Sequence, residues 1–473
     1  MANFFVGTEA EFEAFRNTAE GKSGTWTRCA NLEAAVTAAT EKGSTILVQS
    51  NTYGADETQS ATLTLSTADL TVKAYGENVD LASGLKISGN GISVSGFNFT
   101  GAATSGSTVL YAIEITGDNT TIAGNTFDAK SQFTNDVIRA VNVDGLVFED
   151  NKILSGLHHA LNLSGCSNVS ILDNTISGVD RSGIQFAGTI GEEIRINNNV
   201  ITLVKEEGDR VDADDAAIVF SGEWHGDASD ADLQMTGNTI SVSGSGISGK
   251  DDDKNEYGIS GIYFGDTTTI LPSMAGVTGN SVSASSGATG IKYEGNKTVD
   301  VPGVSVSADS DSSLVLLPED NVDGGVIFNG GVIEGNGANA GKVLIDSALC
   351  AVRATGDVVT IDGVEYKVGT NLFGSYADAS ASLSDVTTVV FNGNVTENIT
   401  YTETSRLTLV GNGGTFSGAL SGSGLVSVTG FVFDAEQDLS SFDAGSIFSL
   451  CTFNRVVNVG NVSIENGTSG RRS

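Results

Sequence analysis

The chain has 473 residues, including 60 glycines and only three prolines. Its 58 acidic residues outnumber 24 basic ones, giving a formal net charge of −34, and such a surface repels nucleic acid and anionic membranes. The charge therefore leads us to expect no nucleic-acid partner. No apolar run of about 18 residues occurs, so we also expect no membrane insertion.

The first predicted element is a helix near the N-terminus. Asn31 is a favourable N-cap, residues 32–42 are rich in alanine, and Gly43 is a typical helix stop. We expect residues 1–44 to cover the open end of the structure that follows, because bare strand edges invite aggregation.

A short cassette recurs further along the chain. It consists of an aliphatic residue, any residue, an aliphatic or aromatic residue, and a nearby glycine. Copies begin at Ile113, Val141, Leu161, Ile184, Ile218, Ile262 and Ile291. Side chains alternate between the two faces of a strand, so we expect the apolar pair of each copy to face a core and the middle residue to face water.

A second series of segments, each starting with asparagine, lies between these copies. It begins at Asn125, Asn151, Asn174, Asn199, Asn238 and Asn280, at intervals of 26, 23, 25, 39 and 42 residues. Periods of about 20 to 50 residues are typical of stacked repeats. Each repeat therefore supplies at least two short strands, and the wider intervals predict inserted loops. Stacking buries the apolar residues of one turn against those of the next.

With these repeats the sequence resembles the right-handed parallel β-helix proteins, which include pectate lyases, polygalacturonases, alginate epimerases, phage tailspikes and bacterial surface adhesins. The resemblance covers roughly residues 45–300 and resumes at about residue 386. It implies an all-β solenoid, nearest in character to the adhesins. Asp214-Asp215 is not followed by the Gly-His-Gly of polygalacturonases, and Tyr257-Gly-Ile259 lacks the acid and histidine of the epimerase motif.

Three later strand segments repeat three earlier ones. Thr45–Val48 matches Thr388–Phe391, Leu70–Val72 matches Leu407–Leu409, and Val94–Phe99 matches Val428–Phe433, at offsets of 343, 337 and 334. The drifting offset predicts two homologous modules that differ by small deletions. The predicted regions are a helical cap (1–44), a parallel β-helix (45–300), a β-rich connector (301–366), and a second, shorter β-helix with its own cap (367–473).

Two features of the last regions are predicted in more detail. The connector should hold a hairpin that turns at Asp362-Gly363, and its segment Gly324–Ile333 is either a hairpin or a cap. Residues 375–384 form a weaker helix candidate that would cap the second module.

The repeat also predicts a strip of charged and imidazole side chains. Positions six to eight residues beyond three of the asparagines hold His158 with His159, Asp180 with Arg181, and Lys205 with Glu206. Equivalent positions on successive turns stack about 4.8 Å apart, so we expect these side chains to lie in line.

The resemblance to polysaccharide lyases and epimerases implies roles for this strip. Arg181 would neutralise a substrate carboxylate, Lys205 or His159 would abstract a proton, and Asp180 would orient one of them. We favour the alternative that these are solvated turn positions, and assign no catalytic residue. A third possibility is a non-catalytic glycan strip made of His158, His159, Arg181, Lys205 and Trp224, whose ring would stack on a sugar.

Two acidic loops, 209–215 and 251–256, offer clustered carboxylates. Asp209, Asp212, Asp214 and Asp215 are candidate calcium ligands. Neither loop has EF-hand spacing, so we favour an exposed charge run and assign neither a metal nor another cofactor.

The four cysteines lie far apart, without a Cys-x-x-Cys motif. They are Cys29, Cys166, Cys350 and Cys451. We therefore expect neither a disulfide framework nor a zinc site, and Cys166 should be buried as a small apolar residue.

Together these features favour an extracellular structural or adhesive protein of a bacterial or phage surface over an enzyme, and they leave the enzymatic alternative open. Its expected partners are a surface glycan or further copies of itself, because the last turns have no predicted cap and would allow head-to-tail addition into fibres. The start of the chain lacks the basic and apolar regions of a signal peptide, which leaves the export route open. The alternative is a polysaccharide lyase or epimerase that acts on an acidic glycan.

Overall fold

The computed structural model divides into two compact units, Met1–Ser281 and Val282–Ser473. It describes residues 1–469 apart from 50–51, 54–61, 101–109, 129–132, 134, 207–208, 210, 213, 225–231, 248–255, 266–272, 295–297, 310–311, 317–324, 330–332, 336–341, 344–349, 354–357, 362–363, 368–375, 377–387, 392–394, 403–405 and 412–413. Among the described residues, no helix is long and apolar enough to cross a membrane.

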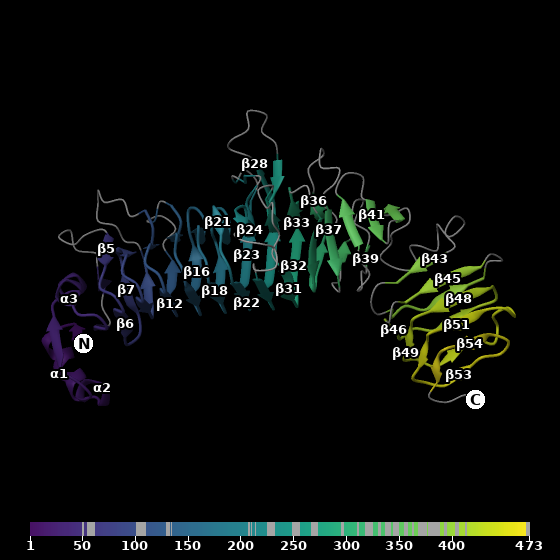
Figure 1. The fold of residues 1–473 in the computed structure, drawn as a ribbon, viewed down its shortest axis with the longest axis horizontal. Helices are drawn as coiled ribbons and strands as arrows, with labels where there is room; N and C mark the ends of the chain where they lie inside the picture. The colour runs from purple at the N-terminus through teal and green to yellow at the C-terminus, as the bar shows by residue number, and fades with distance from the viewer. Residues whose placement is uncertain are drawn as a thin grey trace. The chain divides into compact units, whose positions relative to one another are not determined.

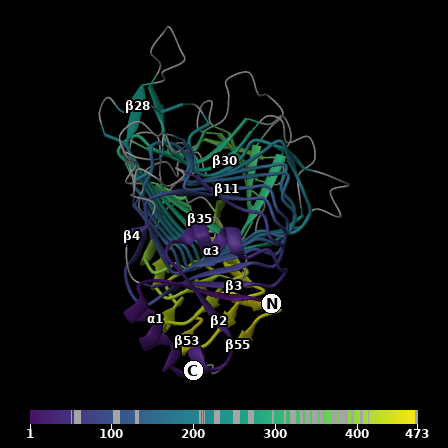
Figure 2. The ribbon, with the colours of Figure 1, turned by 90° about the vertical axis from the view of Figure 1, so that its left-hand side faces the viewer.

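Three parallel sheets form the walls of the first unit, and the chain visits them in rotation (Figures 1 and 2). Sheet A is β2 (Trp26–Cys29), β1 (Asn3–Val6), β3 (Thr45–Gln49), β6 (Thr71–Tyr75), β9 (Ser93–Ser95), β12 (Thr121–Ala123), β15 (Val147–Glu149), β18 (Val169–Leu172), β22 (Ile194–Asn197), β26 (Asp232–Thr236) and β31 (Ser273–Thr278). Sheet B of this unit is β4 (Thr52–Tyr53), β7 (Val79–Leu81), β10 (Phe97–Phe99), β13 (Thr126–Asp128), β16 (Lys152–Ser155), β19 (Thr175–Ser177), β23 (Val200–Val204) and β27 (Thr239–Ser243). Sheet C of this unit is β5 (Thr62–Leu65), β8 (Gly84–Ile87), β11 (Ile113–Ile115), β14 (Ile138–Val141), β17 (Leu161–Ser164), β20 (Ile184–Ala187), β24 (Ala216–Phe220) and β30 (Ser260–Phe264). The fold is the predicted right-handed parallel β-helix.

The cassette residues form a column inside the coil. Ile113, Leu161 and Ile184 face the core on β11, β17 and β20 of sheet C and are fully buried. The prediction is wrong at Val141, because the register pairs Ile113 with Ile138 and so points Ile138 and Ala140 inward. Val141 faces outward on the same strand and is half-exposed.

The asparagine series forms a buried ladder at the turn from sheet A to sheet B. The backbone N–H and Nδ2 of each asparagine from Asn125 to Asn238 donate to Oδ1 of the next one along, with distances from 2.8 to 3.2 Å. Nδ2 of Asn151 also donates to the carbonyl of Ile122 at 2.9 Å. The ladder therefore satisfies polar groups that the stacked turns bury.

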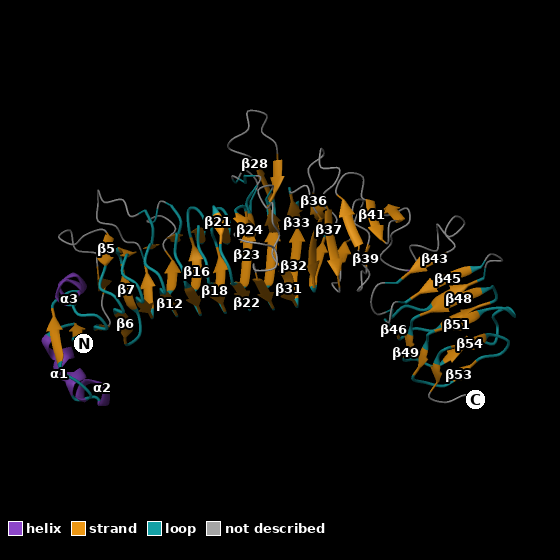
Figure 3. Cartoon of the chain, viewed as in Figure 1, coloured by secondary structure: helices purple, strands orange, loops and turns teal. Residues whose placement is uncertain are grey.

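Short helices cover the first turns of the coil, where the sequence predicts a cap (Figure 3). They are α1 (Glu9–Arg16), α2 (Ala19–Lys22) and α3 (Leu32–Ala38). As predicted, Asn31 caps α3 by accepting the N–H of Ala34 at 2.8 Å. The helix ends at Ala38, earlier than the predicted stop at Gly43. Phe5 of β1 stacks on Phe15 of α1 at 4.6 Å, which joins the cap to the coil.

The wide intervals of the asparagine series contain inserted strands. The segment after β24 includes β25 (Glu223–Trp224), which pairs with β21 (Thr189–Ile190) of the preceding turn. A hairpin of β28 (Ser245–Ile247) and β29 (Glu256–Gly258) stands away from the sheets in Figure 1. The predicted insertions are thus confirmed where the structure describes them.

The second unit opens with further strands of parallel and antiparallel sheets. They are β32 (Asn280–Ser285), β33 (Thr289–Tyr293), β34 (Thr298–Pro302), β35 (Val304–Ala308), β36 (Ser313–Leu316), β37 (Gly325–Asn329), β38 (Ile333–Gly335), β39 (Lys342–Val343), β40 (Cys350–Arg353), β41 (Val358–Ile361) and β42 (Val364–Lys367). Strands β41 and β42 form the predicted hairpin, with Ile361 opposite Val364. Strands β37 and β38 pair with other strands, so the segment 324–333 is not a hairpin.

The remaining strands of this unit repeat the parallel pattern on a smaller scale. They are β43 (Thr388–Val390), β44 (Ile399–Tyr401), β45 (Leu407–Val410), β46 (Thr415–Phe416), β47 (Leu420–Gly422), β48 (Val426–Thr429), β49 (Val432–Phe433), β50 (Gln437–Asp438), β51 (Ile447–Ser449), β52 (Thr452–Phe453), β53 (Val457–Asn458), β54 (Ser463–Glu465) and β55 (Thr468–Ser469). The matched segments of the sequence become β3, β6 and β9 in one sheet and β43, β45 and β48 in another, consecutive in both. Apart from Tyr376, the helix candidate at 375–384 lies outside the described residues, and the boundaries at 44, 300 and 366 stay predictions.

Candidate functional site

The predicted strip lies at the turns that lead into sheet C of the first unit. His158 and His159 precede β17, Arg181 precedes β20, and the N–H of Arg181 donates to the carbonyl of His158 at 3.2 Å. The structure therefore places His158 and Arg181 on neighbouring turns. Their side chains have different surroundings, and this difference decides which of them can meet a ligand.

The guanidinium of Arg181 is held by carboxylates of the acidic loop. Its Nε lies 2.5 Å from Oδ1 of Asp215, its Nη2 lies 2.8 Å from Oδ2 of Asp212, and Asp214 is 3.6 Å away. The Asp215 side chain has no exposed surface. Burial raises the pKa of Asp215, and Arg181 opposes that shift. With its charge matched inside the protein, Arg181 is poorly placed to neutralise a substrate carboxylate.

Lys205 has a similar structural role. Its Nζ donates to the carbonyl of Asp180, and the residue is buried. Desolvation lowers the pKa of Lys205, while the nearby carboxylates of Asp215 and Asp180 raise it. The two cations that the sequence offered for catalysis therefore hold the turns and the loop together.

Three of the four candidate calcium ligands contact the guanidinium of Arg181. Asp212, Asp214 and Asp215 all contact Arg181, whose guanidinium stands where a bound ion would be needed. Asp209 instead accepts the backbone N–H of Glu206 at 2.9 Å. This arrangement does not fit a calcium ion that all four residues share. The other acidic loop, apart from Glu256, lies outside the described residues.

Trp224 packs into the protein instead of facing a ligand. The residue is 4% exposed, and its ring lies 5.6 Å from that of Phe220. No ring face is therefore presented for a sugar, because the β21–β25 pairing turns Trp224 inward beside Ile190.

A paired carboxylate and imidazole form the exposed part of the strip. Nδ1 of His158 lies 2.5 Å from Oδ1 of Asp136, whose side chain is only 2% exposed. Oδ2 of Asp136 accepts a hydrogen bond from Nδ2 of Asn162 at 3.0 Å. The carboxylate thus fixes the imidazole with its proton on Nδ1, which leaves the lone pair of the neutral ring on Nε2. The His158 side chain is 34% exposed, so a ligand can reach it.

His159 lies edge-on to His158, with ring centroids 4.2 Å apart. Its Nδ1 accepts the backbone N–H of Ser182 at 3.1 Å. The pKa of His159 falls to about 3, chiefly because burial disfavours the charged ring and also because His158 lies beside it. His159 is therefore a neutral ring with its proton on Nε2.

This protonation state bears on metal binding. Asp136, His158 and His159 bring possible ligand atoms within 4.8 Å of one another. A metal-bound histidine normally donates its second nitrogen to an acceptor, whereas the second nitrogen of His159 itself accepts a hydrogen bond. The cluster fits a hydrogen-bonding site better than a metal site.

The outward face of sheet C extends this site. Glu114, Arg139, Asn162 and Gln185 are paired neighbours on β11, β14, β17 and β20, and all are half-exposed. Arg139 donates to the hydroxyl of Tyr111 and lies over its ring at 5.2 Å. Among the described residues, Arg139 has no carboxylate partner. We call Tyr111, Asp136, Arg139, His158 and Asn162 the sheet C site.

Sequence reasoning missed four of these five residues. The signal for Asn162 was the middle position of a cassette, which faces outward on its strand. The signal for Arg139 was hidden, because the cassette of that turn was placed at Val141 instead of Ile138.

Comparisons with known proteins agree with the fold. A family model described as the right-handed beta helix region matches residues 75–223. No curated protein sequence matches the chain.

Several solved structures are similar to parts of the chain at low sequence identity. The catalytic domain of a GH87 alpha-1,3-glucanase in complex with nigerose is 14% identical, with 63% of this chain and 66% of that chain covered and a TM-score of 0.36. PfbA, a surface adhesin of Streptococcus pneumoniae, is 12% identical over 71% of this chain and 94% of its own, with a TM-score of 0.35. The PL6 family alginate lyase AlyGC is 11% identical over 99% and 76%, with a TM-score of 0.20. The chain thus spans about two thirds of the glucanase domain, and these likenesses concern the fold alone.

Proposed function

We propose that the chain is an extracellular structural or adhesive protein of a bacterial or phage surface that binds acidic glycan at the sheet C site. The proposal rests on the different surroundings of two arginines, Arg181 and Arg139. Arg181 is buried among carboxylates, whereas Arg139 lies half-exposed on a sheet face beside an aromatic ring. Only the second arrangement suits a ligand.

The chemistry of the site fits a sugar that carries a carboxylate. A guanidinium pairs well with a carboxylate, while the Asn162 amide and the imidazole of His158 can hydrogen-bond neighbouring hydroxyls. Since the protein as a whole is strongly acidic, binding should depend on this local cation and weaken as salt is added.

Calorimetric titration of the full chain with alginate, pectate and glycosaminoglycan oligosaccharides tests the proposal. Arg139→Gln and His158→Ala should each weaken binding by about tenfold or more, which corresponds to about 1.4 kcal/mol. The control is Arg195→Gln on the outward face of sheet A, where the arginine pairs with Glu193 at 2.9 Å. Equal affinities for all variants, or no binding across the panel, would contradict the proposal.

We also propose that copies of the chain associate with one another. Within the described residues, β54 and β55 are the end strands of their sheets, and the unpaired backbone of an end strand is a template for strand addition. Sedimentation analysis and electron microscopy of the purified protein would show oligomers or fibres. A monodisperse monomer at all concentrations would contradict this part of the proposal.

A polysaccharide lyase or epimerase is the second candidate, and the Asp136–His158 pair favours it. Nε2 of His158 would take the proton next to a uronate carboxylate. In a lyase the electron pair left on carbon would form a C=C bond as the glycosidic C–O bond breaks, and the leaving oxygen would take a proton from water. In an epimerase water would instead return a proton to the opposite face of the carbon. Incubation with the same glycans, followed by ultraviolet absorbance for the unsaturated product and by NMR for epimerised sugars, tests this candidate. Activity should vanish in His158→Ala and persist in Arg195→Gln, and the absence of both products would exclude it.

A further inference from the structure

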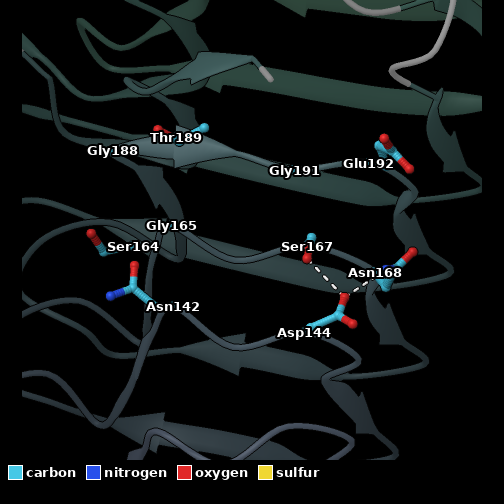
Figure 4. Close-up of a pocket in the computed structure, with 10 residues that line it drawn as sticks. All are labelled: Asn142, Asp144, Ser164, Gly165, Ser167, Asn168, Gly188, Thr189, Gly191 and Glu192. Carbon is cyan, nitrogen blue, oxygen red and sulfur yellow. Dashed lines mark hydrogen bonds between the residues drawn. The ribbon is translucent and has the colours of Figure 1, made fainter. Parts of the chain in front are cut away.

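A polar groove lies at the ends of the sheet C strands opposite to the sheet C site. It occupies about 500 Å³ beside the turns that follow β14, β17 and β20 (Figure 4). Ten residues line it: Asn142, Asp144, Ser164, Gly165, Ser167, Asn168, Gly188, Thr189, Gly191 and Glu192. This volume is in the range of small-molecule sites.

Glycines allow the turns that border the groove to stack closely. Gly165 has φ +67°, and a Cβ there would lie 2.4 Å from Oδ1 of Asn142. A Cβ on Gly191 would meet that of Ser167 at 2.2 Å. The turns therefore stack closely without side chains at these positions, and the neighbouring polar groups border an open space.

Asp144 is held in a fixed orientation at the side of the groove. Its Oδ1 accepts a hydrogen bond from Oγ of Ser167 at 2.8 Å and another from Nδ2 of Asn168 at 2.6 Å, as Figure 4 shows. The Asn168 hydrogen bond, followed by that of Ser167, lowers the pKa of Asp144, so the group is ionised. Within the described part of the chain the second oxygen, Oδ2, has no hydrogen-bond partner, so it can accept a hydrogen bond from a ligand. Such preorganisation by neighbouring side chains is typical of binding sites.

We infer that this groove binds an uncharged, hydroxyl-rich sugar residue. Carboxylate, amide and hydroxyl groups match the donors and acceptors of sugar hydroxyls. None of the ten lining residues is basic, and Asp144 and Glu192 repel a uronate or sulfated sugar. The preference is therefore opposite to that of the sheet C site.

The two sites are close enough to act on one glycan. Asn162 of the sheet C site and Ser164 of the groove both face outward on β17, and two residues of a strand span roughly 7 Å. A chain in which acidic and neutral sugars alternate can reach both. The inference about the groove does not depend on the sheet C site, because neutral oligosaccharides would bind without it.

Saturation-transfer NMR of the full chain with neutral hexose oligosaccharides, including gluco-, galacto- and manno-oligosaccharides, tests the inference. Asp144→Ala and Ser167→Ala should weaken binding of a neutral oligosaccharide by about tenfold. Asp118→Ala is the matched control, because Asp118 occupies the turn before Asp144, accepts its N–H at 3.0 Å and does not line the groove. His158→Ala should leave neutral binding unchanged, which separates this inference from the proposed function.

Three results would overturn the inference. They are no binding of any neutral oligosaccharide at about 10 mM, equal binding by wild type and Asp144→Ala, and loss of binding when a chelator removes divalent cations. Circular dichroism of each variant would confirm that the fold is retained.

Discussion

The substitution Asn174→Ala removes one rung of the buried asparagine ladder. Oδ1 of Asn174 accepts the backbone N–H of Asn151 at 2.9 Å, and its Nδ2 donates to the carbonyl of Phe148 at 2.9 Å and to Oδ1 of Asn199 at 3.0 Å. An orphaned buried N–H costs about 1–3 kcal/mol, and the two lost donor bonds contribute about 1 kcal/mol each. We expect the free energy of unfolding to fall by about 3–5 kcal/mol.

Urea unfolding of the full chain, followed by circular dichroism, measures this loss. Since stacked repeats can unfold in parts, hydrogen exchange at the amide of Asn151 should be measured as well and should become faster. The control is Thr175→Ala at the next, exposed position, which should cost about 0.5 kcal/mol or less.

A third variant tests the donor role of the Asn174 amide. Asn174→Asp replaces Nδ2 by an oxygen that faces two acceptors, so it should be more destabilising than Asn174→Ala at neutral pH. Because the folded state then holds a carboxyl of raised pKa, the deficit relative to wild type should shrink as pH falls. If Asn174→Ala and Thr175→Ala have equal stability, the hydrogen-bond reasoning is refuted.

Three further predictions concern buried side chains. The pKa of His159 is about 3 in the folded protein, against about 6.5 in the unfolded chain. Between these pH values protons bind preferentially to the unfolded state, so the free energy of unfolding falls as pH falls, by up to about 1.4 kcal/mol per pH unit. Urea unfolding at each pH should show that His159→Asn lacks this contribution to the slope, and an unchanged slope would contradict a neutral His159. Arg181→Met leaves two buried carboxylates without their cation and should lower the free energy of unfolding by about 3–5 kcal/mol. The control Arg195→Met, on the outward face of sheet A, should lower it by about 1 kcal/mol or less. Equal urea midpoints for the two variants would refute the structural role of Arg181. Burial raises the pKa of Cys166 and Cys451, so peptide mapping should find both alkylated only after unfolding, and rapid labelling of the native protein would show that they are accessible.

The fold could be predicted because its signals are local and repeated. Alternating apolar residues fix the inward face of each strand, and the spacing of the asparagines fixes the turn length. The error at Val141 shows the limit of this method, since the nearby glycine of the cassette follows Val141 and Val143 but not Ile138 and Ala140, and only pairing with Ile113 selects Ile138. The hydrogen bonds of the ladder also depend on register between turns, which sequence spacing alone does not supply.

The site was harder to predict because it depends on which partner each side chain meets. The strip position of Arg181 could be counted along the repeat, but its partners Asp212 and Asp215 come from an inserted loop whose path has no periodic signal. Their contact converts a candidate substrate anchor into an internal ion pair. Asp136 likewise lies one turn before His158, and only stacking of the turns brings the two together.

Chemical footprinting of His158 is a direct measurement of glycan binding at the sheet C site. Diethyl pyrocarbonate should modify the half-exposed His158 in the unliganded protein and leave the buried His159 unmodified as an internal control. With a saturating acidic oligosaccharide, we expect modification of His158 to be strongly suppressed. Modification that proceeds equally with and without every acidic glycan would contradict glycan binding at the sheet C site.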